Sequence, residues 1–590
     1  MPSTFFGLNI GASGLYTYQS ALNTTGQNAS NVETPGYTRQ IVDLKAGNPI
    51  SVYSGYGMVG TGVTISSVYQ VRNEYFDQKY RYNSGVYGFY NTCENYMMQI
   101  ENYFNEFQNE GFTKTTGFLS NALQELSKDP TSGPVRAQIT QYGTSLTEYV
   151  NSLAAGMKSL QEDCNFEIRN TVDRINAYAK QLATLNKQIN TVEINGTMAN
   201  DLRDQRNLIV DELSKLANVS VKESVVGDNI GKTSYRVSLA GHMLVDTAEF
   251  NTIHVVPRTS EINMDDAVGL YQIEWSDGNF LNPAKVSVGG TLQALFDMRD
   301  GNNGDNFGGT IEAINGNEIT ITNTNINREE LLNIAKEGVI TFGKKEYEYT
   351  SFSITETANG YQYSFVLKET PDASLVGEEA RIGDSINVKG IPYYMNRLNE
   401  FVRTFAKNFN KVHNQGQYQD EHGNLQSGLD FFGVMNGAMS FNEGQNALSY
   451  GSSYYHMTAS NFSVNSDIVR DPNLIVTTDD IGNGEGNTKI LEKLIACMDD
   501  RSMFKEGAPS AFLQSFVADI GVDGKKAYTF AQNQLNLLES IENQRLSESG
   551  VDPDEEALNL VKYQNAYNLS AKVIQVMDEI YERLINYMGA

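Results

Sequence analysis

Histidine and cysteine, the side chains most often used as metal ligands and nucleophiles, are few and scattered in this sequence. The chain contains His242, His254, His413, His422 and His456, together with Cys93, Cys164 and Cys497. The histidines have no HExxH-type spacing, and the cysteines form no CxxC pair and an odd set for disulfides. Cys93 lies in "YGFYNTCENYMMQIENYF", where no basic residue would lower its pKa, so we expect it to be a packed helix residue rather than a nucleophile.

Glycine-rich and acidic stretches give equally weak signals for a bound cofactor or metal. "GYGMVG" places Gly55, Gly57 and Gly60 at G-x-G-x-x-G spacing, but a strand-like pattern follows it where a dinucleotide site needs a helix. "DGNNGDN" and "DDIGNGEGN" are rich in oxygen ligands but do not keep the register of a calcium loop. We therefore predict turns at these places and a protein that is not an enzyme, with no cofactor and no metal site.

The charge of the chain disfavours two classes of partner. Its 590 residues include 44 Lys and Arg against 71 Asp and Glu, a net charge of 44 − 71 = −27, which repels nucleic-acid phosphates and anionic lipid surfaces. No apolar run approaches the roughly 18 residues that a membrane span requires. The first residues lack the basic start of a secretory signal, so we expect no cleaved signal peptide. Composition alone favours a cytoplasmic globular protein of several domains.

The N-terminal residues predict a helix with no charge on any face. Small or apolar residues recur with a period of about 3.5 at Leu8, Gly11, Leu15, Tyr18, Leu22, Thr25, Ala29 and Val32. The opposite face carries the uncharged polar residues Asn9, Ser13, Thr17, Ser20 and Asn28. Such a helix is too weakly amphipathic to stand free in water, so it should be ordered only where both faces meet protein. Pro35 and Gly36 predict its end.

The C-terminal residues predict a second long helix, with a start signal at Asp552, Pro553 and Glu555. Its apolar row includes Leu560, Tyr563, Tyr567, Ala571, Ile574, Met577, Tyr581, Leu584 and Met588. The simplest interpretation is an amphipathic helix on the core of its own domain. Because similar rows stand near both ends of the chain, we favour packing of the two ends against each other and against neighbouring copies. The candidate assembly interface comprises Leu8, Leu15, Tyr18, Leu22, Ala29, Leu560, Tyr567, Ile574, Met577, Tyr581 and Leu584.

Four stretches carry a resemblance to a known family. "GLNIGASGLYTYQSALNTTGQNASNVETPGYTRQ" resembles the N-terminal signature of bacterial flagellar axial proteins, which include rod, hook and hook-associated subunits. "SGVDPDEEALNLVKYQNAYNLSAKVIQVMDEIYERLIN" is similar to their C-terminal tail. Between these ends, "ANDLRDQRNLIVDELSKLANVSV" and "GGTLQALFDMRD" resemble hook-associated members, and the four motifs keep the family's order along the chain.

The resemblance implies a structural subunit of the bacterial flagellum that forms a layer between hook and filament and is required for filament assembly. It also implies partners: further copies of the chain, hook protein, a second hook-associated junction protein, and an export chaperone on the C-terminal region. Nucleic acid and membrane insertion are not expected. The location would be extracellular, reached unfolded through the flagellar type III channel. Two alternatives remain: another axial protein, such as hook protein or the second junction protein, or a junction-like subunit whose residues 302–389 carry an adhesive or enzymatic activity.

The pattern along the chain predicts an α+β multidomain fold, with long paired terminal helices and β-rich domains inserted in the middle. We expect a terminal helical polymerisation domain (1–40 and 550–590), a helical rod domain (41–219 and 470–549), a β-rich middle domain with helices (220–301 and 390–469) and an inserted outer β-rich domain (302–389). A helical hairpin should turn at "EINGT", and Asn315-Gly316 and Asn359-Gly360 predict β-hairpins. Residues 432–466 should complete the β domain that begins at Ser220.

Overall fold

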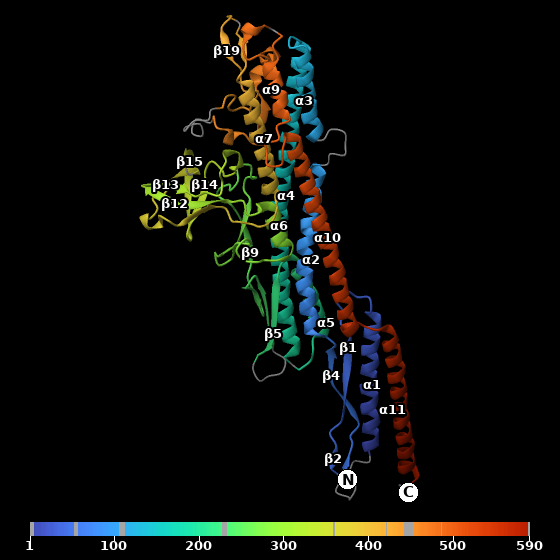
Figure 1. The fold of residues 1–590 in the computed structure, drawn as a ribbon. Coiled ribbons are helices and arrows are strands. Elements are labelled where there is room, and N and C mark those ends of the chain that lie inside the picture. The colour runs from blue at the N-terminus through green and yellow to red at the C-terminus, as the bar shows by residue number, and fades with distance from the viewer. Residues whose placement is uncertain are drawn as a thin grey trace.

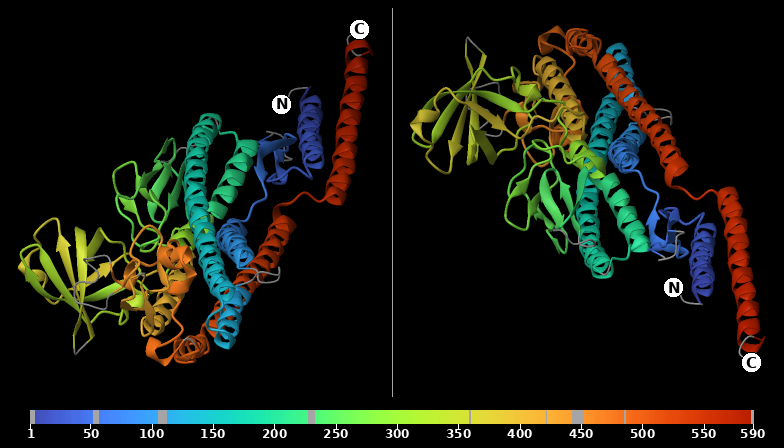
Figure 2. Two further views of the ribbon diagram at one scale, coloured as in Figure 1. Left: turned by 90° about the horizontal axis from the view of Figure 1, so that it is seen from above. Right: turned by 90° about the horizontal axis from the view of Figure 1, so that it is seen from below.

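The computed structural model describes residues 5–51, 57–104, 112–194, 196–226, 233–357, 360–420, 422–441, 452–484 and 486–587. These residues form an elongated molecule in which the first and last helices lie together at one end and a β-rich lobe projects from one side (Figure 1). The two further views agree with this arrangement (Figure 2). Gly55, Asn195, Asn359 and Met588, which the sequence patterns include, lie outside the described residues.

Long helices run along most of the molecule, in agreement with the expected α+β class. They are α1 (Phe6–Ser30), α2 (Glu74–Tyr103), α3 (Phe112–Lys128), α4 (Gly133–Glu193), α5 (Asn200–Leu216), α6 (Gly290–Asp300), α7 (Ile391–His413), α8 (Ser466–Arg470), α9 (Lys489–Met498), α10 (Pro509–Ser549) and α11 (Pro553–Tyr587). The longest, α4, has 61 residues and buries a row that continues from Leu146 to Ile189. The row predicted from Ile168 onward is therefore only its C-terminal half.

The predicted helical hairpin is confirmed where α4 turns back into α5. Gly196 has a φ of +83°, a backbone conformation that favours glycine, and α5 begins four residues later. The buried carboxylate of Glu193 accepts a hydrogen bond from the backbone N–H of Ala199 at 3.0 Å and forms an ion pair with Arg203 at 2.6 Å. These bonds fix the return of the chain at the end of the rod.

Short strands fill the middle of the chain and the region after α1. Near the N-terminus these are β1 (Gln40–Ala46), β2 (Ile50–Ser51), β3 (Met58–Val59) and β4 (Val63–Gln70). A four-stranded sheet contains β5 (Val219–Val225), β6 (Thr233–Leu239), β7 (His242–Asp246) and β8 (Glu249–Phe250), and a three-stranded sheet contains β9 (Ile253–Pro257), β10 (Tyr271–Trp275) and β11 (Phe280–Leu281). Later two-stranded sheets pair β18 (Gln417–Gln419) with β19 (Leu425–Ser427) and β20 (Phe432–Val434) with β21 (Phe462–Val464).

The expectation that residues 432–466 complete the β domain begun at Ser220 is wrong. β20 pairs with β21 and with neither of the sheets formed by β5–β11. The reason is aromatic packing, because the ring of Phe432 lies 5.4 Å from that of Phe405 and 5.2 Å from that of Phe409, both on α7. These strands therefore belong to the core of the helical body.

Residues between α6 and α7 form a closed antiparallel barrel, which is the projecting lobe of Figure 1. Its strands are β12 (Phe307–Asn315), β13 (Glu318–Thr322), β14 (Gly338–Phe342), β15 (Lys345–Thr357), β16 (Gly360–Leu367) and β17 (Glu379–Ile382), in the order β12-β13-β16-β15-β14-β17. The hairpin predicted at Asn315-Gly316 is confirmed between β12 and β13. The barrel has an apolar core of its own, and the backbone N–H of Gly390 donates to the carbonyl of Gly301 at 3.2 Å where the chain enters and leaves it.

The barrel is also held by the helical body. Arg403 on α7 is fully buried, and its guanidinium donates to the backbone carbonyls of Glu330 and Leu332 on the barrel side and of Tyr455 and Met457 on the body side. The hydroxyl of Tyr455 donates to the carbonyl of Ile334 at 2.7 Å, and its ring lies within the barrel core. The division at 302–389 stays our proposal, and the side chains of Arg403 and Tyr455 cross it.

Candidate functional site

The two terminal helices, α1 and α11, lie side by side and pair as the sequence predicted (Figure 1). Three glycines of α1 form the contact row. A Cβ atom on Gly7 would lie 2.5 Å from Cε of Met577, one on Gly11 would lie 2.7 Å from Cγ1 of Ile574, and one on Gly14 would meet Ser570. The helices therefore approach closely because these positions have no side chain. This explains why a helix of poor intrinsic propensity contains so many glycines.

Aromatic side chains extend the pairing on either side of the glycine row. The rings of Phe5 and Tyr581 lie 5.1 Å apart, and those of Tyr18 and Tyr563 lie 6.5 Å apart in a stacked arrangement. Burial and nearby acidic groups raise the pKa of Tyr563, so it stays a neutral phenol at any physiological pH. The pair is thus held without charged groups along most of its length.

The polar face of α1 packs against the hairpin formed by β1 and β4. The side chain of Asn28 bonds the backbone of Gln40 twice, through its amide nitrogen at 2.9 Å and its oxygen at 3.0 Å. The hydroxyl of Thr17 donates to the carbonyl of Val63 at 3.2 Å, and that of Ser13 accepts from the N–H of Val63. Both faces of the uncharged helix therefore meet protein within one chain. Because β1 and β4 pack on α1, we propose to place residues 41–70 with the terminal domain rather than with the rod domain.

The predicted interface residues occupy three kinds of position. Four on α1 are half-buried (Leu8, Leu15, Tyr18 and Leu22), four on α11 are half-buried (Tyr567, Ile574, Met577 and Tyr581), and three are exposed (Ala29, Leu560 and Leu584). Of these, the structure brings Tyr18, Ile574, Met577 and Tyr581 into the helix pair. The row of Leu8, Leu15 and Leu22 flanks this contact. It remains partly open to solvent and stays a prediction for contacts between copies.

Sequence reasoning missed a second apolar row on α11. Leu569, Val573, Val576 and Ile580 are 69%, 44%, 43% and 44% exposed. Their spacing of four, three and four residues places them on one side of the helix, beside the contact with α1. The same periodicity that identified the buried row would have revealed this one, since neither row contains a charged residue.

Of the residues considered first for chemistry, His413 and the three cysteines lie in the core, whereas His242, His254 and His422 are exposed. Burial lowers the pKa of His413 to about 4, and its Nε2 accepts the backbone N–H of Val476 at 3.1 Å, so the ring is neutral. Burial raises the pKa of Cys93, and it raises the pKa of Cys164 and of Cys497 to about 12. These three thiols are therefore not activated as nucleophiles. Cys93 is a packed helix residue, as expected.

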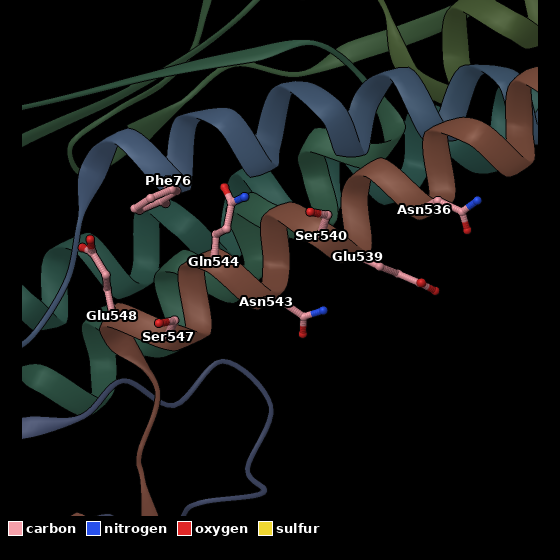
Figure 3. A pocket seen from close by; sticks show the side chains of 8 residues that line it. All are labelled: Phe76, Asn536, Glu539, Ser540, Asn543, Gln544, Ser547 and Glu548. Carbon is pink, nitrogen blue, oxygen red and sulfur yellow. The ribbon is translucent and has the colours of Figure 1, made fainter.

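A surface depression of about 630 Å³ lies along α10 beside the start of α2 (Figure 3). It is lined by Phe76, Asn536, Glu539, Ser540, Asn543, Gln544, Ser547 and Glu548. Amides, hydroxyls and two carboxylates on one open helix face do not form a catalytic arrangement. Within the described part of the chain, no three His, Cys, Asp or Glu side chains gather where they could hold a metal ion. The same residues include no helix with the length and apolar character needed to cross a bilayer.

Comparison with known proteins finds family models that match the middle and the C-terminal end of the chain. The family described as "Flagellar hook-associated protein FlgK helical domain" matches residues 97–314, and "Flagellar basal body rod FlgEFG protein C-terminal" matches residues 542–587, which include all of α11. The chain is 26% identical over 600 residues to flagellar hook-associated protein 1 of Bacillus subtilis (strain 168), covering 100% of this chain and 99% of that protein. Along its whole length, the chain is thus similar to flagellar hook-associated protein 1.

Other members of the family show the same extent of similarity. Flagellar hook-associated protein 1 of Escherichia coli (strain K12) is 25% identical over 593 residues, covering 98% of this chain and 99% of that protein. A solved structure of the flagellar hook junction protein FlgK from Burkholderia pseudomallei aligns with a TM-score of 0.46 and 14% identity, over 80% of this chain and 100% of that chain. The sequence matches to the Bacillus subtilis and Escherichia coli proteins include the terminal helices as well as the middle of the chain.

Proposed function

We propose that this chain is a structural subunit of the bacterial flagellum that forms the junction layer between hook and filament. The observation that carries the proposal is the terminal helix pair. Its α11 helix is covered by α1 on one side only and leaves the row of Leu569, Val573, Val576 and Ile580 in water. Contiguous apolar rows of this kind mark sites of association.

Two apolar rows on different faces support a head-to-tail contact between copies. The row of Leu569, Val573, Val576 and Ile580, which flanks the α1 contact on α11, and the row of Leu8, Leu15 and Leu22 on α1 do not overlap. A surface that meets a different surface on the next copy produces a ring or a helical layer, whereas a self-complementary surface produces a dimer. The absence of charge from residues 5–32 suits such burial, because an unpaired buried charge costs several kcal/mol.

The proposed partners follow from this position. They are neighbouring copies, hook protein below, a second hook-associated junction protein above, and an export chaperone that covers the apolar rows of α11 before assembly. The chain would leave the cytoplasm through the flagellar type III channel without a cleaved signal peptide and act outside the cell. Its role would be structural rather than catalytic, which agrees with three deeply buried thiols and a buried neutral His413.

The decisive experiment locates the protein and removes it. Flagella labelled with antibody to this chain should show a single band between hook and filament. A strain that lacks the chain should keep its hooks, secrete flagellin into the medium and form no filaments. Label along the whole filament or hook, or normal filaments in the deletion strain, would contradict the proposal.

A further inference from the structure

Two short connections join the terminal helix pair to the rest of the molecule. Residues 71–73 lead from β4 into α2, and residues 550–552 lead from α10 into α11. We call the part beyond them (residues 5–70 and 553–587) the terminal domain, and the part formed by α2, α4, α5 and α10 the rod domain. The axis of α11 is offset from that of α10 at this point (Figure 2). With so few residues in each connection, the angle between the domains depends on the contacts that cross the boundary.

Arg39, which lies just before β1, bonds both within the terminal domain and across the boundary. Its guanidinium forms ion pairs with Glu555 at 2.6 Å and with Glu556 at 2.8 Å, at the start of α11. Its backbone N–H donates to the carbonyl of Ser549, the last residue of α10, at 2.9 Å. Glu556 is 2% exposed, and its charge is therefore compensated chiefly by Arg39. A single residue thus ties the two helices on either side of the 550–552 connection.

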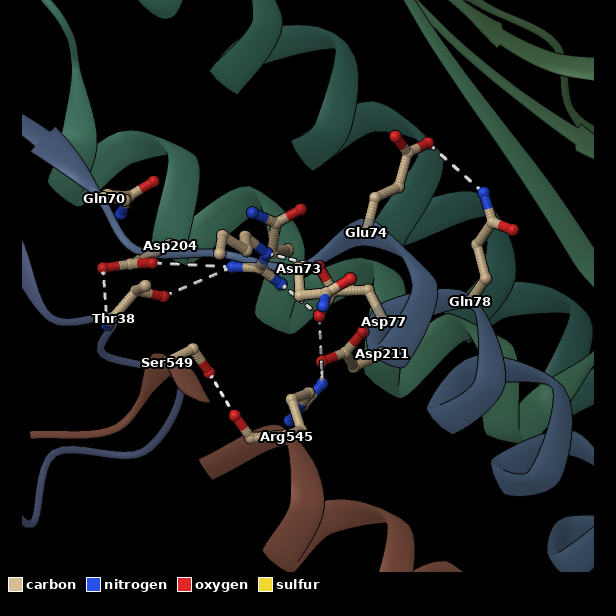
Figure 4. A network of polar contacts seen from close by, with 12 residues as sticks. Thr38, Gln70, Asn73, Glu74, Asp77, Gln78, Asp204, Asp211, Arg545 and Ser549 are labelled. Carbon is tan, nitrogen blue, oxygen red and sulfur yellow. Dashed lines mark hydrogen bonds and ion pairs between the residues drawn. The ribbon is translucent and has the colours of Figure 1, made fainter. Parts of the chain in front are cut away.

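A second group connects the terminal domain to α5 (Figure 4). The backbone N–H of Thr38 donates to Asp204 at 3.0 Å. The guanidinium of Arg72 donates to the Thr38 hydroxyl and forms ion pairs with Asp204 and Asp77. Nearby, the amide of Gln40 donates to Asp201 at 3.0 Å. Burial raises the pKa of Asp204 to about 6 in spite of these bonds, so its charge is poorly compensated at neutral pH.

The rod side of the same network is rigid. Asp211 on α5 accepts from Arg81 on α2 at 2.8 Å and from Arg545 on α10 at 2.7 Å, so it joins three helices. Asn73 on the first connection donates to Glu548 at 2.8 Å. These bonds hold the ends of α2 and α10 together and give the crossing contacts a fixed base.

Charged and amide groups dominate this boundary. Leu208 of α5 contacts Gly36 there but stays 38% exposed. Water replaces polar contacts with little net change in free energy, whereas separating an apolar surface of similar size costs more. A boundary of this composition therefore opens without unfolding either domain.

We propose that three bonds across the boundary, from the N–H of Arg39 to Ser549, from the N–H of Thr38 to Asp204 and from the amide of Gln40 to Asp201, form a polar lock that sets the angle between terminal and rod domains. When the lock opens, the terminal domain turns as a rigid body about residues 71–73 and 550–552. The effect of this angle on assembly rests on the proposed function, because a layer between two different partners needs a defined orientation toward each of them.

Distance measurements between spin labels test the lock on the purified full-length chain. The three native cysteines are buried, so surface cysteines introduced at Tyr16, Leu569 and Tyr82 (73%, 69% and 67% exposed) would take the labels. The pair Tyr16→Cys with Tyr82→Cys spans the boundary, and the pair Tyr16→Cys with Leu569→Cys lies within the terminal domain. The lock would be opened by Asp201→Ala with Asp204→Ala, which removes the α5 carboxylates that accept from Gln40 and Thr38 across the boundary.

The lock predicts different results for the two label pairs. Opening it should broaden and shift the distance distribution across the boundary and leave the one within the terminal domain unchanged. A matched control is Arg236→Gln with Asp246→Asn, an exposed ion pair within one sheet, which should change neither distribution. An unchanged distribution across the boundary would overturn the lock. A broad distribution across the boundary in the parent chain would also overturn it, because the contacts would then not set the angle. Broadening within the terminal domain would overturn it as well, because the contacts would then belong to that domain's own fold.

Flagella provide a separate readout for assembly. Chains with Asp201→Ala and Asp204→Ala should be exported but should restore fewer filaments than the control variant in a strain lacking the protein. Full restoration would show that the angle does not matter for assembly and would overturn that part of the inference. Because the distance measurement requires no flagellum, failure of the proposed function would leave its result intact.

Discussion

Replacing single glycines of α1 by alanine should separate close packing from helix propensity within one helix. Gly11 faces α11, where a new Cβ would lie 2.7 Å from Cγ1 of Ile574 and 3.4 Å from the carbonyl oxygen of Ser570. Gly26 lies in the same helix with no atom within 4 Å of its position for a Cβ. Gly11→Ala should therefore push the two helices apart, and Gly26→Ala is the matched control that should not.

The expected magnitudes have opposite signs. Alanine in place of glycine in an open helical position stabilises the helix by about 0.5–1 kcal/mol, which is the full effect expected for Gly26→Ala. Gly11→Ala gains the same amount but adds an overpacking cost of about 1–3 kcal/mol, because the branched Ile574 cannot move away freely. The two variants should then differ by about 1–3 kcal/mol, or roughly five- to 150-fold in an equilibrium constant.

Hydrogen exchange of α1 amides in the full-length chain measures this difference directly. Exchange should slow in Gly26→Ala and accelerate in Gly11→Ala, relative to the parent chain. Equal slowing in both variants would refute the reasoning, since it would mean that α1 gains helicity without touching α11. That result would instead support the prediction made from sequence that the terminal helices are mobile until neighbouring copies bury them.

Three further predictions concern assembly, acid stability and the barrel. Leu22→Asp should allow export but block incorporation, because an unpaired buried charge costs several kcal/mol, so cells should secrete flagellin and lack filaments. The free energy of unfolding should fall by up to about 3 kcal/mol as pH drops from 6.5 towards 4, because His413 takes up a proton in the unfolded chain but not in the folded one. Urea unfolding of the parent chain and of His413→Gln at several pH values would isolate the contribution of His413. A chain without residues 302–389 should still fold and restore motility. Adding Tyr455→Thr to this deletion should raise its melting temperature, because the substitution removes an aromatic ring that the barrel no longer covers.

Each of these predictions has an outcome that contradicts it. Normal filaments with Leu22→Asp would mean that this side of α1 faces no neighbour. An identical pH dependence in parent and His413→Gln would mean that the ring takes up its proton in the folded state. A deletion chain that folds and is exported but gives no filament would show that residues 302–389 take part in the junction.

Periodicity predicted the terminal pair because the pairing repeats locally along each helix. It did not identify which row of α1 makes the contact. The predicted row contained Gly11 and Tyr18, which do contact α11, but the candidate interface included Leu8, Leu15 and Leu22 and left out Gly7, Gly11 and Gly14. Glycine allows close packing because it has no side chain, and a pattern of apolar side chains does not reveal such positions.

Contacts between distant segments were beyond the reach of local patterns. The polar face of α1 was expected to meet protein, but the local pattern did not show that Asn28 bonds Gln40 of the chain's own hairpin. The strands of the barrel were visible as alternating residues, yet their closure depends on β12 meeting β17 across the whole insert. Arg403 gave no signal, because a charged residue inside an apolar helix pattern resembles an exposed one until its acceptors are known.

The terminal domain has a further consequence for the order in which the chain folds. Arg39 and Glu556 are 517 positions apart, and closing a flexible loop of that length costs roughly 5–6 kcal/mol of chain entropy. A folded rod removes most of that cost, because the bond from Asn73 to Glu548 already holds the two connections side by side. The rod therefore folds first and the terminal domain last. A subunit still emerging from a ribosome or a channel has no completed polymerising end, so the timing of assembly is built into the chain's topology.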